Sequence, residues 1–172
     1  VIRADFEDRV YRLSQTAFAE LATRGRLIPV VREIRADLDT SLSLFKRVDD
    51  GHISFLFESV EGAEKWARPS FIGVGARAIF RARGREIEWT EGGETQTHQA
   101  TGDPLEFLRD KLAGLDAVVP DGVGVDLPPF LGGAVGFVGY DWVRFVEEIP
   151  DENPDEIGLP DLWFVFPETV VV

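Results

Sequence analysis

The sequence contains no cysteine among its 172 residues. Disulfide bonds, thiolate metal sites and cysteine nucleophiles are therefore excluded, and the composition suits a reducing cytoplasm. No apolar run approaches the roughly 20 residues that a membrane-spanning helix needs, and no signal-peptide pattern opens the chain. We therefore expect a cytoplasmic protein.

Positive charge is also scarce, because 18 Lys and Arg residues stand against 31 Asp and Glu residues, for a net charge of −13. A chain this acidic is repelled by phosphate backbones and by anionic membrane surfaces. We therefore expect neither nucleic acid nor a membrane among its partners. Hydrophobic residues make up 44% of the chain, which is ordinary for a folded globular protein.

Both ends lack the features of natural termini. Position 1 is valine rather than methionine, and the chain stops in two apolar segments, 162–166 and 169–172, with no polar tail. A strand that is apolar at successive positions is typically buried on both faces. We therefore expect a longer protein whose continuation covers these segments, and an apolar patch there in the isolated chain.

Local patterns predict an α+β fold, with a largely antiparallel sheet and flanking helices. Helical spacing and capping residues predict helices over 14–24, 41–47 and 103–112, and a short one from 141. Alternating β-branched and aromatic residues predict strands over 27–34, 52–59, 70–80, 86–90, 94–99 and 132–140, and a final hairpin-like pair in 162–172. Glycines at 84 and at 92–93 predict the turns of an antiparallel meander. Residues 1–13 show no clear period and form an N-terminal extension.

Two glycine-rich motifs resemble phosphate-binding loops. Gly73-Val74-Gly75-Ala76-Arg77-Ala78 fits a loose dinucleotide fingerprint, but a strand pattern follows it, whereas that fingerprint requires a helix N-terminus. The series Gly133, Gly136 and Gly139 lacks the Lys-Ser/Thr pair of a phosphate loop. We interpret both motifs as places where backbones pack closely.

Catalytic and metal-binding patterns are missing as well. The two histidines, His52 and His98, stand in strand-like settings that favour packing or surface roles. The carboxylates of 147–156 are interrupted by two prolines and lack the regular ligand spacing of a calcium loop, which favours a solvated acidic loop. We predict no catalytic residue, no cofactor and no metal site in this chain.

One group of residues suits an amino-acid ligand. The strand that ends in Phe57, Glu58 and Ser59 is followed ten residues after Glu58 by Arg68. An α-amino acid needs an anion for its ammonium, a cation and hydrogen-bond donors for its carboxylate, and an apolar wall for its side chain. Glu58 could supply the anion. Arg68 and Ser59 could supply the cation and a donor, and Phe57 could supply the apolar wall. The alternative is a surface Glu–Arg pair beside a buried strand, which is commonplace.

Six segments, in order and at similar spacing, resemble the N-terminal half of anthranilate synthase component I. They are 28–34 (IPVVREI), 37–40 (DLDT), 54–62 (SFLFESVEG), 64–68 (EKWAR), 70–73 (SFIG) and 132–141 (GGAVGFVGYD). The resemblance runs from about Phe18 to the last residue. It implies that 14–172 form the N-terminal, regulatory region of that large subunit and stop before its chorismate-binding catalytic domain.

The resemblance also implies a fold and an activity for the longer protein. The fold would be one half of a layered α/β/β/α enzyme. The reaction would be a lyase reaction that converts chorismate and ammonia to anthranilate and pyruvate, the first step of tryptophan biosynthesis. Mg²⁺ would bind in the absent catalytic domain, a glutamine amidotransferase subunit would deliver ammonia, and L-tryptophan would inhibit by feedback. This chain alone would be inactive.

The family's Leu-Leu-Glu-Ser motif falls on 56–59, and its downstream basic residue falls on Arg68. The resemblance therefore implies that Phe57, Glu58, Ser59 and Arg68 contribute to an allosteric tryptophan site. Two positions depart from the family pattern: Phe57 replaces the second leucine, and Pro69 replaces the usual tyrosine. Proline fixes the local backbone and removes an amide donor next to Arg68.

Two rival interpretations remain. The matching half of aminodeoxychorismate synthase component I, in the folate pathway, shares the fold and the substrate. A stand-alone binding or interaction module is the rival from another class. The Glu58-Ser59 pair and the run that follows it favour the anthranilate enzyme, while the apolar C-terminal segment argues against a stand-alone module.

Overall fold

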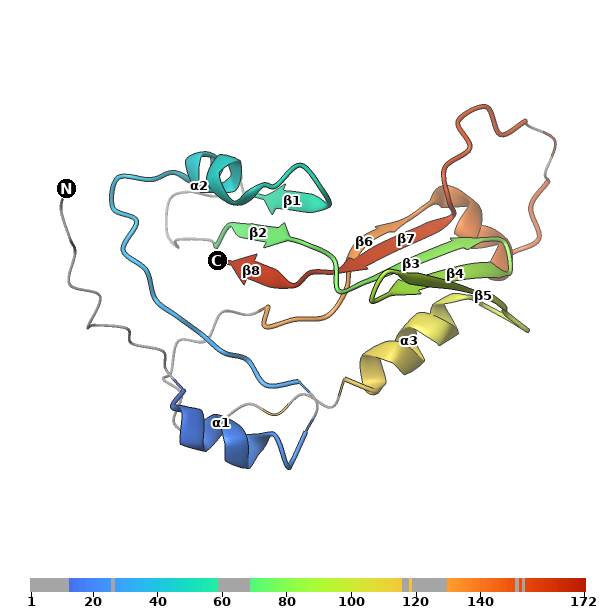
Figure 1. Ribbon diagram of the computed structural model, residues 1–172. Coiled ribbons are helices and arrows are strands. Elements are labelled where there is room, and N and C mark those ends of the chain that lie inside the picture. Colours follow the sequence, from blue (N-terminus) through green and yellow to red (C-terminus); the bar gives the residue numbers. More distant parts are fainter. Residues whose placement is uncertain are drawn as a thin grey trace.

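The fold, given by a computed structural model, is α+β, with two antiparallel sheets and few helices (Figure 1). The structure describes residues 13–25, 27–58, 69–115, 118, 130–150, 152 and 154–172. The helices are α1 (Gln15–Leu21), α2 (Ser41–Val48) and α3 (Leu105–Ala113), with a 3₁₀ helix η1 (Tyr140–Phe145). The strands are β1 (Ser54–Phe57), β2 (Phe71–Val74), β3 (Ala78–Arg83), β4 (Glu86–Glu91), β5 (Glu94–Gln99), β6 (Val135–Val138), β7 (Leu162–Phe166) and β8 (Thr169–Val171).

The strands divide into a three-stranded sheet of order β1-β2-β8 and a five-stranded sheet of order β5-β4-β3-β7-β6. Every strand pair in both sheets is antiparallel. The predicted meander is confirmed in β3, β4 and β5. Its turns contain glycines with positive φ, at Gly84 (49°), Gly92 (60°) and Gly93 (83°), a conformation that glycine adopts without steric cost.

The chain crosses between the two sheets at two neighbouring points, from β2 into β3 and from β7 into β8 (Figure 1). Because β2 pairs with β8 and β3 with β7, the four strands form one long antiparallel pair that is interrupted. Residues 75–77 lie opposite only 167–168 at the interruption, so the first segment bulges by one residue. Such a bulge bends the strand and ends regular pairing, and Gly75, with φ of 71°, accommodates the bend.

The main core lies between the five-stranded sheet and α3 (Figure 1). Alternation along β3 directs Ala78, Phe80 and Ala82 to this face, and all three are at most 2% exposed. Burying a side chain the size of phenylalanine or leucine contributes about 1.5–3 kcal/mol, so this cluster is the chief stabilising element of the described fold. Its other buried members are Ile87, Trp89, Leu108, Leu162 and Phe166.

Each α-helix begins at a polar side chain that satisfies its first free amide groups. Ser14 accepts a hydrogen bond from Ala17 N, and Thr40 accepts one from Ser43 N at 3.1 Å. At the start of α3, Asp103 Oδ1 accepts hydrogen bonds from Leu105 N and from the indole N–H of Trp142, both at 2.9 Å. The same carboxylate therefore starts α3 and ties η1 to it.

The structure corrects three predictions about strands and their pairing. Segment 27–34 forms only isolated bridges, since Pro29 lacks an amide donor. The predicted strand 70–80 is split by the bulge into β2 and β3. The expected hairpin in 162–172 is wrong, because β7 and β8 belong to different sheets.

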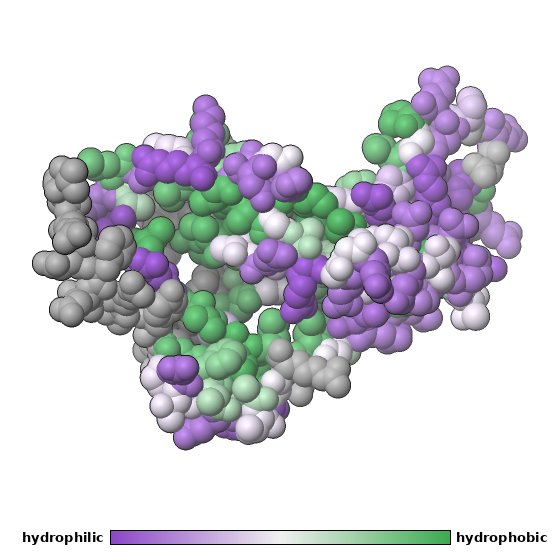
Figure 2. All heavy atoms as spheres, in the orientation of Figure 1, coloured by the Kyte–Doolittle hydropathy of each residue, from purple (hydrophilic) through white to green (hydrophobic). Residues whose placement is uncertain are grey.

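The expected apolar patch near the C-terminal end is also largely wrong. Leu162, Val165 and Phe166 are at most 2% exposed: β7 is paired with β3 on one edge and with β6 on the other, and Leu162 and Phe166 belong to the core cluster. Val172 remains 49% exposed. Figure 2 shows a hydrophobic area over β1 and β2 and a hydrophilic surface over β4 and β5. No helix in the described part of the chain is long and apolar enough to cross a membrane.

Candidate functional site

The Glu58 side chain lies at the end of β1, beside the first turn of α2. The hydroxyl of Ser41, the first residue of α2, donates a hydrogen bond to Glu58 Oε1. Helix N-termini carry a partial positive charge that favours nearby carboxylates. This position therefore suits a carboxylate, and in the described part of the chain Oε1 is the oxygen of Glu58 that accepts a hydrogen bond.

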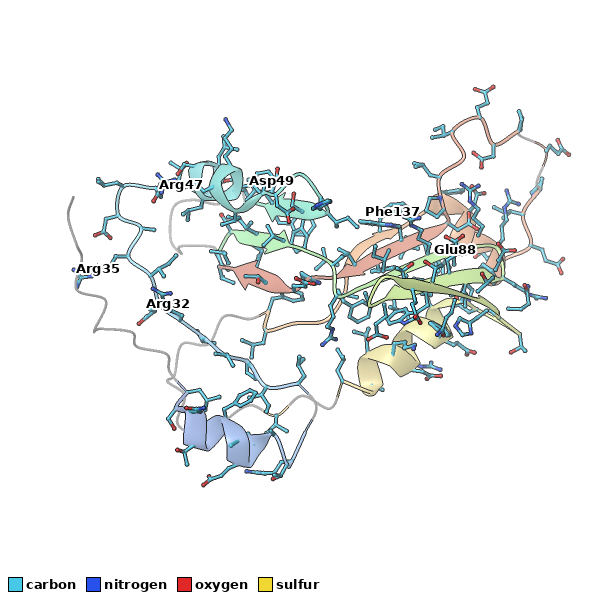
Figure 3. All side chains as sticks on the ribbon, in the orientation of Figure 1. Arg32, Arg35, Arg47, Asp49, Glu88 and Phe137 are labelled. Atoms are coloured by element: carbon cyan, nitrogen blue, oxygen red, sulfur yellow. The ribbon has the colours of Figure 1, made fainter. Side chains whose placement is uncertain are left out.

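Two further contacts hold α2, one to the segment before it and one to β1. Asp39 binds both terminal nitrogens of the Arg47 guanidinium at 3.0 Å, and its side chain is only 16% exposed. Asp49, just after α2, accepts a hydrogen bond from the hydroxyl of Ser54 at 2.9 Å, which joins the other end of the helix to the start of β1. Figure 3 shows Arg47 and Asp49 on either side of α2. The helix that carries Ser41 is thus held at both ends.

Phe57 contributes an aromatic surface next to Phe55. Their ring centroids are 5.0 Å apart, and Phe57 is 52% exposed. The ring of Phe55 lies over Gly73 on β2, where an added Cβ would overlap it. Gly73 therefore lets Phe55 lie flat on the sheet, beside the partly open Phe57.

Phe57 and Glu58 contact different parts of the molecule. Phe57 packs against Phe55, whereas Glu58, which follows the end of β1, accepts a hydrogen bond from Ser41. Ser59 and Arg68 lie outside the described residues. Their roles at the ligand site therefore stay predictions. Pro69, which follows Arg68, is exposed.

Ser41 is the residue of this site that sequence reasoning missed. It was predicted only as the start of a helix, and 17 positions separate it from Glu58. No spacing rule connects residues that far apart. The capping pattern of Asp39 and Thr40 predicted where α2 begins, but tertiary packing alone decides which side chain its first turn meets.

The two glycine-rich motifs and His98 have the structural roles that were predicted for them. Strand β3, and no helix, follows the Gly73–Ala78 motif. An added Cβ at Gly136 would overlap the backbone of Trp163 and Phe164, and one at Gly139 would come within 2.9 Å of Asp161 O. His98 packs against Phe107 with a centroid separation of 4.9 Å. No group of three or more possible metal ligands occurs among the described residues.

Comparison with known proteins extends this description. No protein-family model matches the chain. Anthranilate synthase component 1 from Acinetobacter calcoaceticus is 40% identical over 164 residues, which cover 92% of this chain and 32% of that protein. Its counterpart from Thermus thermophilus is 40% identical over 148 residues, which cover 86% of this chain and 30% of that protein. The resemblance to anthranilate synthase component I is confirmed.

The chain thus spans about a third of the length of the anthranilate synthase components that it matches. A crystal structure of anthranilate synthase component I from Streptococcus pneumoniae aligns with 81% of this chain and 28% of that one, at 26% identity and a TM-score of 0.45.

Proposed function

We propose that this chain is the N-terminal regulatory portion of an anthranilate synthase component I and that it contributes to a feedback site for L-tryptophan. The longer protein would be a cytoplasmic, chorismate-utilising lyase in tryptophan biosynthesis. The observation that carries the proposal is the carboxylate of Glu58, which Ser41 holds at the start of α2, in the motif that resembles the family's Leu-Leu-Glu-Ser.

Glu58 takes the role of acceptor for the ligand's ammonium group. Its carboxylate is exposed, and Ser41 is its hydrogen-bond donor in the described chain. Ser59 and Arg68 take the ligand's carboxylate, and the open ring of Phe57 forms part of the wall for the indole. These roles match the three chemical needs of an aromatic amino acid: an anion, a cation with donors, and an apolar surface.

Catalysis belongs to the part of the protein beyond this chain. There we propose Mg²⁺, the chorismate site and the residues that perform the elimination, with ammonia supplied by a glutamine amidotransferase subunit. Inhibition then requires that tryptophan binds the inactive state of the whole enzyme more tightly than the active state. The chain alone is inactive in this proposal.

The direct test uses the protein encoded by the longer reading frame. Incubation with chorismate, Mg²⁺ and ammonia should yield fluorescent anthranilate, and L-tryptophan should suppress its formation while L-phenylalanine at equal concentration should not. Accumulation of aminodeoxychorismate instead of anthranilate would show that the chain belongs to the rival enzyme of the folate pathway, aminodeoxychorismate synthase component I. Anthranilate formation that tryptophan leaves unchanged would contradict the feedback site while leaving the family intact.

A further inference from the structure

A second candidate site lies on the five-stranded sheet, on the face opposite α3. A depression of about 440 Å³ is lined there by strands β3, β4, β6 and β7 and by the segment before β7. None of its lining residues belongs to α2, β1 or β2, so it is separate from the residues around Glu58. The lining residues are Arg81, Ala82, Arg83, Glu86, Glu88, Phe137, Leu159, Pro160 and Trp163.

One half of the depression is aromatic and apolar. Phe137 on β6 and Trp163 on β7 are register partners, and their rings stack with centroids 6.3 Å apart and planes inclined by 25°. Phe137 is 40% exposed and Leu159 is 61% exposed, so this apolar surface is open. Open aromatic rings of this kind attract cations through the negative faces of their π systems.

The other half of the depression carries four charged side chains, two arginines and two glutamates, whose ion pairs differ. Arg83 lies opposite Glu86 in the ladder, but its guanidinium turns away to the carbonyl of Gly158 and to Asp155, 3.8 Å away. In the described part of the chain Glu86 therefore has no ion pair. Arg81 approaches Glu88 only at 4.0 Å, and both side chains are about half exposed, so this contact stabilises little.

The geometry points to a docking site for a basic side chain, an arginine or lysine that projects from a protein partner. Its aliphatic stem would lie on Trp163 and Phe137, and its cation would face Glu86. Arg81, which lies between Trp163 and Glu88 in the sheet, would keep its contact with Glu88. Figure 3 shows Glu88 and Phe137 at the same end of the molecule. The net charge of −13 also draws a basic partner and repels an acidic one.

Hydrogen bonds hold in place the segment before β7, which forms one wall of the depression. Asp155 accepts hydrogen bonds from the amides of Ile157 and Gly158, and Asp161 accepts one from Gly84 N at 2.6 Å. These bonds fix the segment that carries Leu159 against the turn between β3 and β4. The same segment therefore binds the guanidinium of Arg83, which draws it away from Glu86, and exposes Leu159 to solvent.

The test follows the indole N–H signals of the ¹⁵N-labelled 172-residue chain by NMR. The probes are N-acetyl-arginine-N-methylamide, its glutamate counterpart, and free agmatine. The Trp163 signal, assigned with a Trp163→Phe variant, should shift saturably with the arginine probe, with a dissociation constant on the order of millimolar. The glutamate probe should leave it unmoved.

Variants separate the charge from the aromatic surface. Glu86→Gln with Glu88→Gln should weaken the arginine probe roughly fivefold. Glu94→Gln, on β5 and outside the depression, is the matched control and should change nothing. Equal binding of both amino-acid probes, no saturable shift, or an unaffected double variant would each overturn the proposal. Agmatine binding at least about tenfold tighter than the blocked arginine would assign the site to a small metabolite and overturn the protein partner.

Discussion

The hydroxyl of Ser41 donates a hydrogen bond to the carboxylate of Glu58, and so joins the first turn of α2 to the end of β1. A carboxylate in this position meets the positive end of the helix and a neutral donor. Among the described residues, its side-chain partner is this neutral hydroxyl rather than a cation. That combination suits recognition of an ammonium group better than a surface Glu–Arg pair does.

Replacing Gly73 by alanine should destabilise the chain by about 1–3 kcal/mol, the usual cost of overpacking. The added methyl would overlap the ring of Phe55, which must then leave its place on β2. Gly102→Ala is the control, because its Cβ would meet only a carboxylate oxygen of Glu106 at 3.9 Å. Urea denaturation of both variants measures the difference, and equal stability would show that Phe55 repacks freely.

The sequence predicted local structure well where the signal itself was local. The capping residues of α2 and the glycine turns of the meander were correct because neighbouring residues determine them. The division between β2 and β3 was missed, since a bulge is defined by the register with β7 and β8. Burial of Leu162 and Phe166 was also missed, because a strand's neighbours come from distant segments.

The candidate site shows the same division between local and long-range information. Glu58 was identifiable because its residue type and its motif both point to amino-acid binding. Ser41 was not, since its contact with Glu58 depends on how α2 lies against β1. Likewise, no sequence pattern brings Glu86 near Trp163, because β4 and β7 meet only through β3.

Thr40→Ala should lower the stability of the chain by about 1 kcal/mol, because it removes the oxygen that accepts from Ser43 N at the start of α2. Thr40→Ser keeps that oxygen and should stay near the original stability. Thermal unfolding followed by circular dichroism compares the two. An alanine variant as stable as the serine variant would show that the contacts of Asp39 with Arg47 suffice to hold this end of the helix.

The isolated chain should form no anthranilate from chorismate, Mg²⁺ and excess ammonia. The described residues contain no cluster that would hold the metal, and metal-assisted elimination needs such a cluster together with an acid–base pair. Anthranilate fluorescence provides a sensitive measurement, with the longer protein as the positive control. Fluorescence that increases in proportion to the amount of pure chain would place the active site here and contradict the proposed division of labour.

Ser59→Leu in the longer enzyme should raise the inhibitory concentration of tryptophan while keeping uninhibited turnover within a few-fold. The change removes a hydroxyl donor from the ligand's carboxylate and adds bulk at the same point. Measurement of anthranilate formation against tryptophan concentration tests it. Loss of turnover and inhibition together would make Ser59 a structural residue, whereas unchanged inhibition would direct attention to Pro69 and a rearranged pocket.

Glu58 and Ser41 should act on tryptophan through one shared interaction, which a double-mutant cycle in the longer enzyme can measure. Losing the anionic partner of a bound ammonium typically costs about 2–5 kcal/mol. Glu58→Ala should therefore weaken tryptophan inhibition roughly 30-fold or more, and Ser41→Ala should weaken it less, because it removes only a neutral hydrogen bond to the carboxylate. In the Glu58→Ala background the Ser41 change should add almost nothing, since the hydroxyl acts through a group that is no longer present. Uninhibited turnover should survive in all three variants.

Effects that simply add would show that Ser41 supports the fold independently of Glu58, and normal inhibition of Glu58→Ala would remove Glu58 from the ligand site.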